Sequence, residues 1–139
     1  MARYYLDTCI WRDFHENRIG SGGKPLGKIA FSFIIQCAKK KEDIIISDKV
    51  ISELHGQYSQ DEVESLFKSL AMVVQTVRMN VQKDDILNAE ALSRKHDIPR
   101  SDALHAILSQ KANAILITRD KHFLKIKEEC IIRKPEELL

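Results

Sequence analysis

Four acidic side chains lie far apart in the chain and could do chemistry together if the fold brought them to one place: Asp7, Glu53, Asp102 and Asp120. Asp102 stands in the segment "DIPRSDALHAIL", one step into a helix that is predicted to be buried. A carboxylate beside an apolar helix face is costly to desolvate unless it caps the helix, pairs with a cation or holds a metal. Carboxylate oxygens are hard ligands that suit Mg²⁺ or Mn²⁺. The four acids therefore indicate a candidate divalent-metal site.

Predicted strands alternate with predicted helices along the chain. Buried strands are predicted at residues 3–6 ("RYYL"), 43–48 ("DIIISD") and 113–118 ("NAILIT"), with shorter strands within 72–81 and 129–138. Uninterrupted apolar strands are typical of a parallel sheet that is covered on both faces. The alternation predicts an α/β fold, a sandwich with a mostly parallel central sheet.

This architecture would carry the four acids to one edge of the sheet, because ligands bind beyond the carboxyl ends of parallel strands. Asp7 ends the first strand, and Asp120 follows the strand at 113–118. Glu53 lies one turn into the helix after the strand at 43–48, and Asp102 opens the helix that leads into the strand at 113–118. Mutual repulsion would prevent all four from ionising there unless a divalent cation neutralised them.

Helix starts are predicted from capping residues. Ser47 would cap a helix that follows the strand at 43–48, and Ser59 and Glu62 have the spacing of a capping box. Ser101 would cap the helix that contains Asp102. Four of the five glycines lie within residues 20–27, which predicts a flexible loop ahead of a helical pattern at 29–37.

Each acid also has a purely structural interpretation. Asp102 could favour the positive end of its helix dipole behind Ser101, and Asp7 and Asp120 could be ordinary turn residues. Glu53 could point to solvent from an amphipathic helix. The functional hypothesis therefore depends on the four acids together and not on any one of them.

Composition bounds the class of protein. A chain of 139 residues with 44% hydrophobic and 30% charged residues predicts one globular domain spanning 1–139. The net charge of +2 does not by itself indicate a nucleic-acid binder. Three scattered cysteines lack metal-ligand spacing and fit reduced thiols in a cytoplasmic protein. No apolar run is long enough for a signal peptide or a membrane span.

Four ordered segments carry a resemblance to a known family: "YYLDTCIW", "SDKVISEL", "IPRSDALHAIL" and "AILITRDKHF". Their order and approximate spacing resemble PIN-domain ribonucleases, and within these the VapC-like toxins of type II toxin–antitoxin systems. The resemblance covers nearly the whole chain and implies a three-layer α/β/α sandwich. It also implies that the protein is a hydrolase that cleaves RNA phosphodiester bonds with the help of Mg²⁺ or Mn²⁺.

The resemblance assigns roles to particular residues. Asp7, Glu53, Asp102 and Asp120 match the family's acidic, metal-binding and catalytic cluster, with Asp7 and Asp102 as the principal ligands. Thr118 matches the hydroxyl residue that supports the cluster, and Thr8 is given a similar role. Arg119 and Lys121 flank Asp120 and are candidates for contact with the RNA backbone or, alternatively, parts of a solvated loop.

The resemblance also implies partners: an antitoxin protein that blocks the acidic groove, and a second copy of the chain in a homodimer. The loop at 20–27 is longer than the compact toxins carry at this place, so it leaves the groove's shape and the partner open. One alternative is a nuclease of RNA processing outside any toxin–antitoxin pair. Another is a catalytically silent PIN-like module that binds RNA or protein, which would not need a metal.

Two other classes are disfavoured by the residues. "GGKPLGKI" has P-loop spacing, but Ile29 stands where Ser or Thr should hold Mg²⁺, and no buried strand precedes it. Asp7 could be the nucleophile of a phosphotransfer domain, but Cys9 replaces the second aspartate that one large phosphatase family requires. Of the five histidines, His105 alone lies one turn after Asp102, and a structural role is expected for it.

Overall fold

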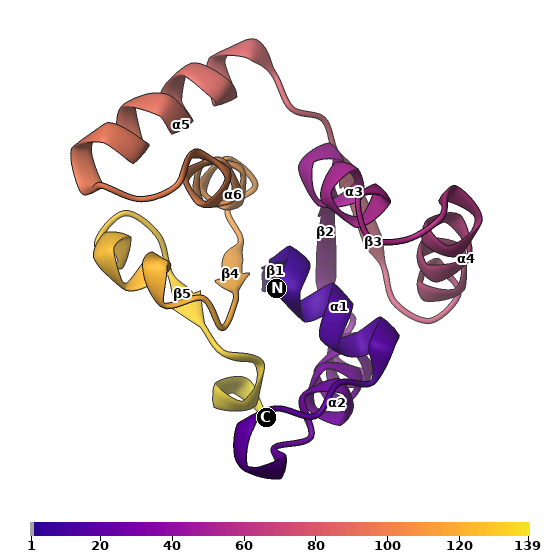
Figure 1. The fold of residues 1–139 in the computed structure, drawn as a ribbon. Coiled ribbons are helices and arrows are strands. Elements are labelled where there is room, and N and C mark those ends of the chain that lie inside the picture. Colours follow the sequence, from indigo (N-terminus) through magenta and orange to yellow (C-terminus); the bar gives the residue numbers. More distant parts are fainter. Residues whose placement is uncertain (1) are drawn as a thin grey trace.

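A computed structural model describes residues 2–139 and shows a five-stranded parallel sheet with helices on both faces (Figure 1). The strands are β1 (Arg3–Leu6), β2 (Asp43–Ser47), β3 (Thr76–Met79), β4 (Ile115–Ile117) and β5 (Ile132–Arg133). The α-helices are α1 (Thr8–Glu16), α2 (Leu26–Lys40), α3 (Asp48–His55), α4 (Gln60–Ala71), α5 (Lys83–His96) and α6 (Arg100–Lys111). Short 3₁₀ helices are η1 (Ser21–Gly23), η2 (Lys121–Ile126) and η3 (Pro135–Leu138).

The predicted α/β sandwich is confirmed, and the sheet is parallel throughout its five strands. Their order is β3-β2-β1-β4-β5, so the first strand lies at the centre and the chain winds outward in both directions. In Figure 1, α5 and α6 lie above the line of strands, and α1 and α2 lie below it. The short strand expected within 72–81 is β3, at one edge of the sheet, and the one expected within 129–138 is β5, at the other.

The centre of the sheet forms the core because its strands are apolar on both faces. Tyr5 pairs with Ile45 on one side and Leu116 on the other, and all three side chains are buried. Trp11, on α1, is fully buried, and its indole N–H donates to the carbonyl of Leu6 at 3.1 Å. Within residues 2–139, none of the helices combines the length and the apolar character that a membrane crossing needs.

The register of β1 and β4 determines where the first acid lies. Tyr4, Tyr5 and Leu6 pair with Ile115, Leu116 and Ile117. The backbone N–H of Asp7 then donates to the carbonyl of Ile117 at 2.9 Å, just beyond the last paired residue. Both strands therefore end at the same level of the sheet, and Asp7 and the segment after β4 emerge at the same carboxyl edge.

Capping residues explain where most of these helices begin. The hydroxyl of Ser47 accepts the N–H of Val50 at the start of α3, and that of Ser59 accepts the N–H of Glu62 at the start of α4, as predicted. The prediction for Ser101 is wrong, because α6 starts two residues earlier than predicted, with Pro99 at its N-cap. Proline's fixed backbone angle suits a helix start, and Ser101 donates instead to the Glu53 carboxylate at 3.4 Å.

Candidate metal-binding site

The four predicted carboxylates line one cavity of about 290 Å³ at the carboxyl edge of the sheet. Its lining comes from the ends of β1 and β4 and from α1, α3 and α6, which the sheet order brings together. The lining residues are Asp7, Thr8, Cys9, Arg12, Glu53, Gln57, Asp102, His105 and Asp120. Residues from nearly the whole length of the sequence therefore meet at this edge, as the parallel topology predicts.

Asp7 is the most enclosed of these acids, with 7% of its surface exposed. It caps α1, and one carboxylate oxygen accepts the backbone N–H of Thr8 at 2.7 Å. The other oxygen, Oδ2, accepts the hydroxyl of Thr118 at 2.8 Å, and the Cys9 thiol lies 3.5 Å from it. These donors hold the carboxylate in one orientation, and the contact with Thr118 fits the supporting role expected of that residue.

Glu53 reaches the same cavity from α3. Its Oε1 accepts the hydroxyl of Thr8 at 2.6 Å and lies 2.6 Å from Nε2 of His105. Burial acts to raise the pKa of Glu53, but the hydrogen bonds from His105 and Thr8, together with the nearby Lys49, outweigh it and lower the pKa to about 2. Glu53 is therefore ionised at neutral pH without any bound metal.

His105 is a buried residue that positions the Glu53 carboxylate, which is a specific form of the structural role expected from the sequence. Its ring is 1% exposed and lies on α6 one turn after Asp102. The ionised Glu53 accepts a hydrogen bond from Nε2, so in the neutral ring Nδ1 accepts one from the hydroxyl of Tyr5, at 2.7 Å. The Tyr5 oxygen also lies 2.7 Å from Oγ of Ser47. A buried chain of hydrogen bonds from the sheet therefore orients the Glu53 carboxylate.

A second group of ligand atoms lies at the more open side of the cavity and consists of Asp102, Asp120 and His122. Asp102 lies in the first turn of α6, and Asp120 caps η2 by accepting the N–H of His122 at 2.9 Å. Burial raises the pKa of Asp102; a hydrogen bond from His122 opposes this rise, and the charges of Asp120 and Asp7 add to it. His122 was not singled out from the sequence, although its position two residues after Asp120 was the available signal.

Arg119, one of the two residues expected to contact RNA, points away from the cavity. Its Nε lies 3.4 Å from the Asp13 carboxylate, and Nη1 donates to Glu136 at 2.9 Å. These pairs connect the end of β4 to α1 and to η3 near the C-terminus, so the guanidinium has a structural role here. Lys121, by contrast, is exposed beside the acids.

The donor set fits a divalent cation. The ligand atoms form two groups, Asp7 with Glu53 and His105, and Asp102 with Asp120 and His122, and within each group they lie within 4.8 Å of one another. Four carboxylates supply hard oxygen donors of the kind that Mg²⁺ and Mn²⁺ prefer. Their concentrated negative charge also disfavours an anion or a neutral ligand at this place.

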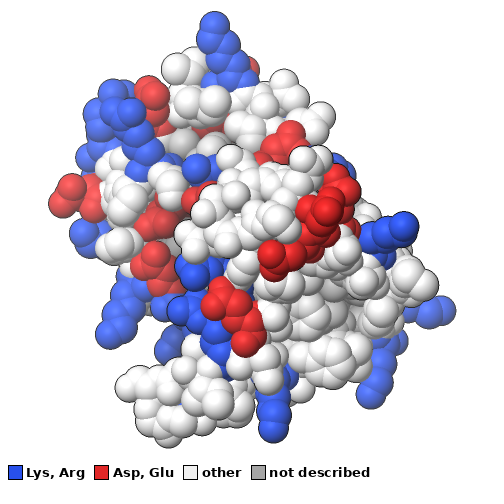
Figure 2. Space-filling view, turned by 45° about the vertical axis from the view of Figure 1, so that its right-hand side comes forward, with Lys and Arg blue, Asp and Glu red and all other residues white. Residues whose placement is uncertain are grey.

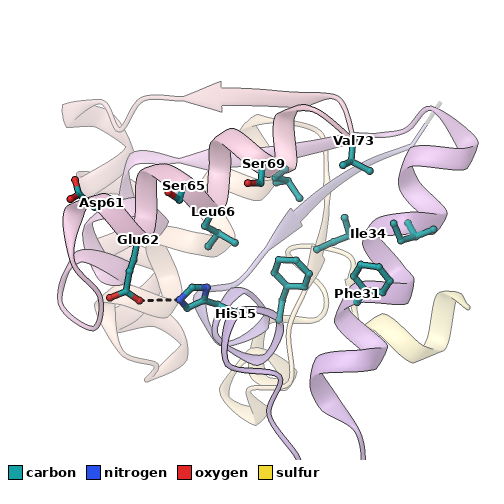
Figure 3. A pocket seen from close by; sticks show the side chains of 12 residues that line it. His15, Phe31, Ile34, Asp61, Glu62, Ser65, Leu66, Ser69 and Val73 are labelled. Atoms are coloured by element: carbon teal, nitrogen blue, oxygen red, sulfur yellow. Dashed lines mark hydrogen bonds and ion pairs between the residues drawn. The ribbon is translucent and has the colours of Figure 1, made fainter.

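A second cavity, of about 530 Å³, lies between α1, α2 and α4 and is mainly apolar. Figure 3 shows Leu66 from α4 and Phe31 and Ile34 from α2 turned toward the same space. His15 and Glu62 are hydrogen-bonded at one end, at 3.1 Å (Figure 3). Because most of the lining is apolar, this groove is a candidate binding surface.

Comparisons with known proteins identify the family and the fold of the chain. The PIN domain family matches residues 4–129, and none of the curated proteins matches the chain. Similar solved structures include VapBC2 from Rickettsia felis bound to a DNA fragment from its promoter (TM-score 0.68, 18% identity, covering 95% of this chain and 98% of that one). VapBC-1 from nontypeable Haemophilus influenzae (0.66, 18%, covering 96% and 98%) and a toxin–antitoxin complex from Klebsiella pneumoniae (0.65, 20%, covering 95% and 97%) are also similar. With identities this low, the structures support the fold, and the family match covers most of the sequence. The chain therefore belongs to the PIN domain family.

Proposed function

We propose that the protein is a divalent-metal-dependent endoribonuclease that acts as the toxin of a toxin–antitoxin pair in the cytoplasm. The observation that carries the proposal is the meeting of Asp7, Glu53, Asp102 and Asp120 in one cavity of a PIN domain. Mg²⁺ or Mn²⁺ held there would activate a water molecule and neutralise charge on the scissile phosphate. Asp7 and Asp102 are proposed as the principal ligands.

The remaining residues of the site have distinct parts in this proposal. Thr118 and the backbone of Thr8 keep the Asp7 carboxylate facing the cavity. Glu53, held ionised by His105 and Thr8, provides the negative charge that orients a water or a second cation. Because these orienting bonds exist before substrate arrives, little reorganisation is needed when the phosphate binds.

The RNA backbone needs positive charge near the cavity, because contacts to phosphate come mainly from Lys and Arg. Lys121 is exposed next to Asp120 and is the candidate that remains, since Arg119 is held by Asp13 and Glu136. On the face seen in Figure 2, most Lys and Arg side chains project around the edge, and acidic side chains lie both nearer its middle and at the left-hand edge.

We further propose a protein partner, as in the toxin–antitoxin complexes to which the fold is similar. The apolar groove between α1, α2 and α4 leaves Phe31 53% exposed and Val73 54% exposed, which favours a partner that covers them. An antitoxin seated there could extend to the acidic cavity, because α1 contributes lining residues to both. We also propose that two copies of the chain form a homodimer, and the molar mass in solution, measured by light scattering, would test this.

The nuclease proposal is tested with purified protein and structured RNAs in Mg²⁺, Mn²⁺ or EDTA. Wild-type protein should cleave only with metal, and Asp102→Asn should lose at least about 100-fold in rate, because even residues that merely orient metal ligands cost 10–100-fold. Asp84→Asn, an exposed first-turn aspartate of α5, is the matched control and should cleave normally. Cleavage that persists in EDTA contradicts the proposal, and binding of RNA without metal and without cleavage favours the silent module.

The toxin proposal is tested in cells. Induced wild-type protein should arrest growth, and co-expression of the protein encoded beside it should restore growth. Phe31→Asp should keep nuclease activity but lose this rescue, because a charge would replace an apolar contact in the groove. Ile131→Asp, at an exposed apolar position outside the groove, serves as control. Normal growth despite active nuclease in the cells contradicts a toxin role and favours RNA processing.

A further inference from the structure

We propose that the imidazole of His122 is itself a ligand of the metal that Asp102 and Asp120 hold, and that this nitrogen makes the site prefer Mn²⁺ over Mg²⁺. The inference depends on the proposed function, since it concerns the same cavity. The proposed function uses only the four carboxylates, whereas this inference adds a nitrogen donor and names the ion that such a donor selects.

The position of the ring carries the inference. Nδ1 of His122 lies 2.9 Å from Oδ2 of Asp102 and 3.2 Å from Oδ1 of Asp120. One nitrogen and two carboxylate oxygens therefore face a common point, although they come from α6, the start of η2 and the turn between β4 and η2. Only a small adjustment of each side chain would place all three around one cation.

The backbone keeps His122 in this position. Asp120 caps η2 by accepting the N–H of His122 at 2.9 Å, and the backbone N–H of Asp120 itself donates to the hydroxyl of Thr118 at 3.0 Å. Thr118 in turn donates to Asp7. The same hydrogen bonds that direct Asp120 toward the cavity thus place the imidazole two residues later beside it. A ligand that is oriented before the metal arrives loses little conformational entropy on binding.

The two histidines of the site differ in what their nitrogens can do. His105 is 1% exposed, and both of its ring nitrogens already have partners, Glu53 and Tyr5. The side chain of His122 is 52% exposed, and its Nδ1 lies beside the carboxylates of Asp102 and Asp120. His105 therefore orients an acid, whereas His122 can turn its Nδ1 lone pair to a cation while Nε2 carries its proton toward solvent.

The nitrogen has a consequence for the choice of ion. Mg²⁺ binds oxygen ligands almost exclusively and keeps several waters, so an imidazole adds little to its affinity. Transition-metal ions accept imidazole nitrogen more readily than Mg²⁺ does, and Mn²⁺ is one of those that also bind carboxylates. A site of two carboxylates and one imidazole should therefore gain affinity for Mn²⁺ from His122 and hardly any for Mg²⁺.

A rival interpretation gives the opposite result. His122 could be a hydrogen-bond donor that satisfies Asp102 and Asp120 in the metal-free protein and must leave before any cation binds. In that case, removing the ring would free both carboxylates, and Mg²⁺ and Mn²⁺ would each bind more tightly. The direction of the change in affinity therefore separates a ligand from a competitor.

The test measures binding of Mn²⁺ and of Mg²⁺ alone by titration calorimetry to wild type, His122→Ala and the control Lys127→Ala, an exposed residue outside the cavity. We expect His122→Ala to weaken Mn²⁺ binding about 10-fold or more and Mg²⁺ binding less than 2-fold, with no selective change in Lys127→Ala. Equal weakening of both ions, or tighter binding of either, overturns the inference.

Pulsed electron paramagnetic resonance of the Mn²⁺ complex gives a readout that does not depend on activity. Wild-type protein should show modulation from a directly bound ¹⁴N nucleus, and His122→Ala should lose it while still binding Mn²⁺ at higher concentration. Mn²⁺ bound without a nitrogen signal, or a signal that persists in His122→Ala, overturns the inference and leaves the nuclease proposal standing. Wild-type protein that binds neither ion overturns both.

Discussion

Replacing Asp102 with asparagine should make the metal-free protein more stable while it destroys the metal site. Carboxylate oxygens of Asp102 and Asp120 lie within 4.8 Å of each other. Two unit charges at that separation repel by about 3 kcal/mol at an effective dielectric constant of 20 and by about 1 kcal/mol in bulk water. The Asp120 side chain is 35% exposed and His122 lies between the two acids, so a value near 1 kcal/mol is expected.

The substitution also removes a favourable charge from the first turn of α6, which is worth about 0.5 kcal/mol. Asp84→Asn loses the same kind of interaction at the start of α5 without relieving any crowding, because Asp84 is exposed. The difference between the two variants therefore reports what the cavity adds at Asp102, which is the burial of its charge and the repulsion from its neighbours, less the bond from His122. In a chain of this size, about 1 kcal/mol corresponds to about 3–5 °C in Tm.

Thermal unfolding followed by circular dichroism, in EDTA and in Mn²⁺, provides the assay. In EDTA, Asp102→Asn should have a higher Tm than both wild type and Asp84→Asn. In Mn²⁺, wild type and Asp84→Asn should gain stability through binding, and Asp102→Asn should not. If Asp102→Asn is less stable than Asp84→Asn in EDTA, the carboxylates do not repel as the geometry requires, and the reasoning is refuted.

Three further predictions concern the scaffold that positions the site. Trp11→Phe should lower the free energy of unfolding, measured with denaturant, by about 2–3 kcal/mol. The smaller ring leaves a gap in the core and removes the N–H that donates to the Leu6 carbonyl. A loss below about 0.5 kcal/mol would contradict this. Burial acts to raise the pKa of Glu136, but hydrogen bonds from Arg119 and Lys24 outweigh it and lower the pKa to about 2. This carboxylate therefore stabilises the fold above about pH 4.5, and its contribution is lost as the pH falls through about 2. Glu136→Gln should be less stable than wild type at pH 7 by about 2–3 kcal/mol, and a difference that did not shrink toward pH 2 in acid unfolding would count against the pairing. Gly27→Ala should lower Tm by several degrees, because a Cβ there would lie 2.5 Å from the Asn17 backbone. The control Gly56→Ala should be tolerated, because its nearest atom would lie at 3.3 Å. Equal effects of the two variants on melting curves would disprove the close approach of α1 and α2.

The meeting of the four acids was predictable from the sequence because it depends on topology. Asp7 and Asp120 each follow a buried apolar strand, and parallel strands leave the sheet at the same edge. Asp102 lies in the first turn of α6 and Glu53 lies one turn into α3, and the starts of both helices point toward that edge. None of this requires knowledge of side-chain packing or of strand order, so the apolar strands and the parallel arrangement that they predict were sufficient.

The neighbours of these acids were less predictable, because they depend on the direction of single side chains. Arg119 precedes Asp120 directly and was expected beside the RNA, but adjacent residues in extended chain point to opposite sides, and Arg119 meets Asp13 and Glu136 instead. Glu136 lies 17 residues further along, in a helix whose packing no local pattern reveals. Likewise, the contact of His105 with Glu53 joins α6 to α3 and follows only from the assembled fold.

The surroundings of Glu53 and Asp102 divide the cavity into two electrostatically different halves. Glu53 receives hydrogen bonds from Thr8 and His105, which outweigh its burial, so its charge is stable in the metal-free protein. Burial raises the pKa of Asp102, and the charges of Asp120 and Asp7 add to this rise. The hydrogen bond from His122 opposes it but does not cancel it. Its charge is therefore the one that most needs a cation. A site organised in this way keeps one half in place at all times and leaves the other half unsatisfied. Binding of the proposed cation should therefore gain its free energy mainly from Asp102 and its neighbours, at the open side of the cavity.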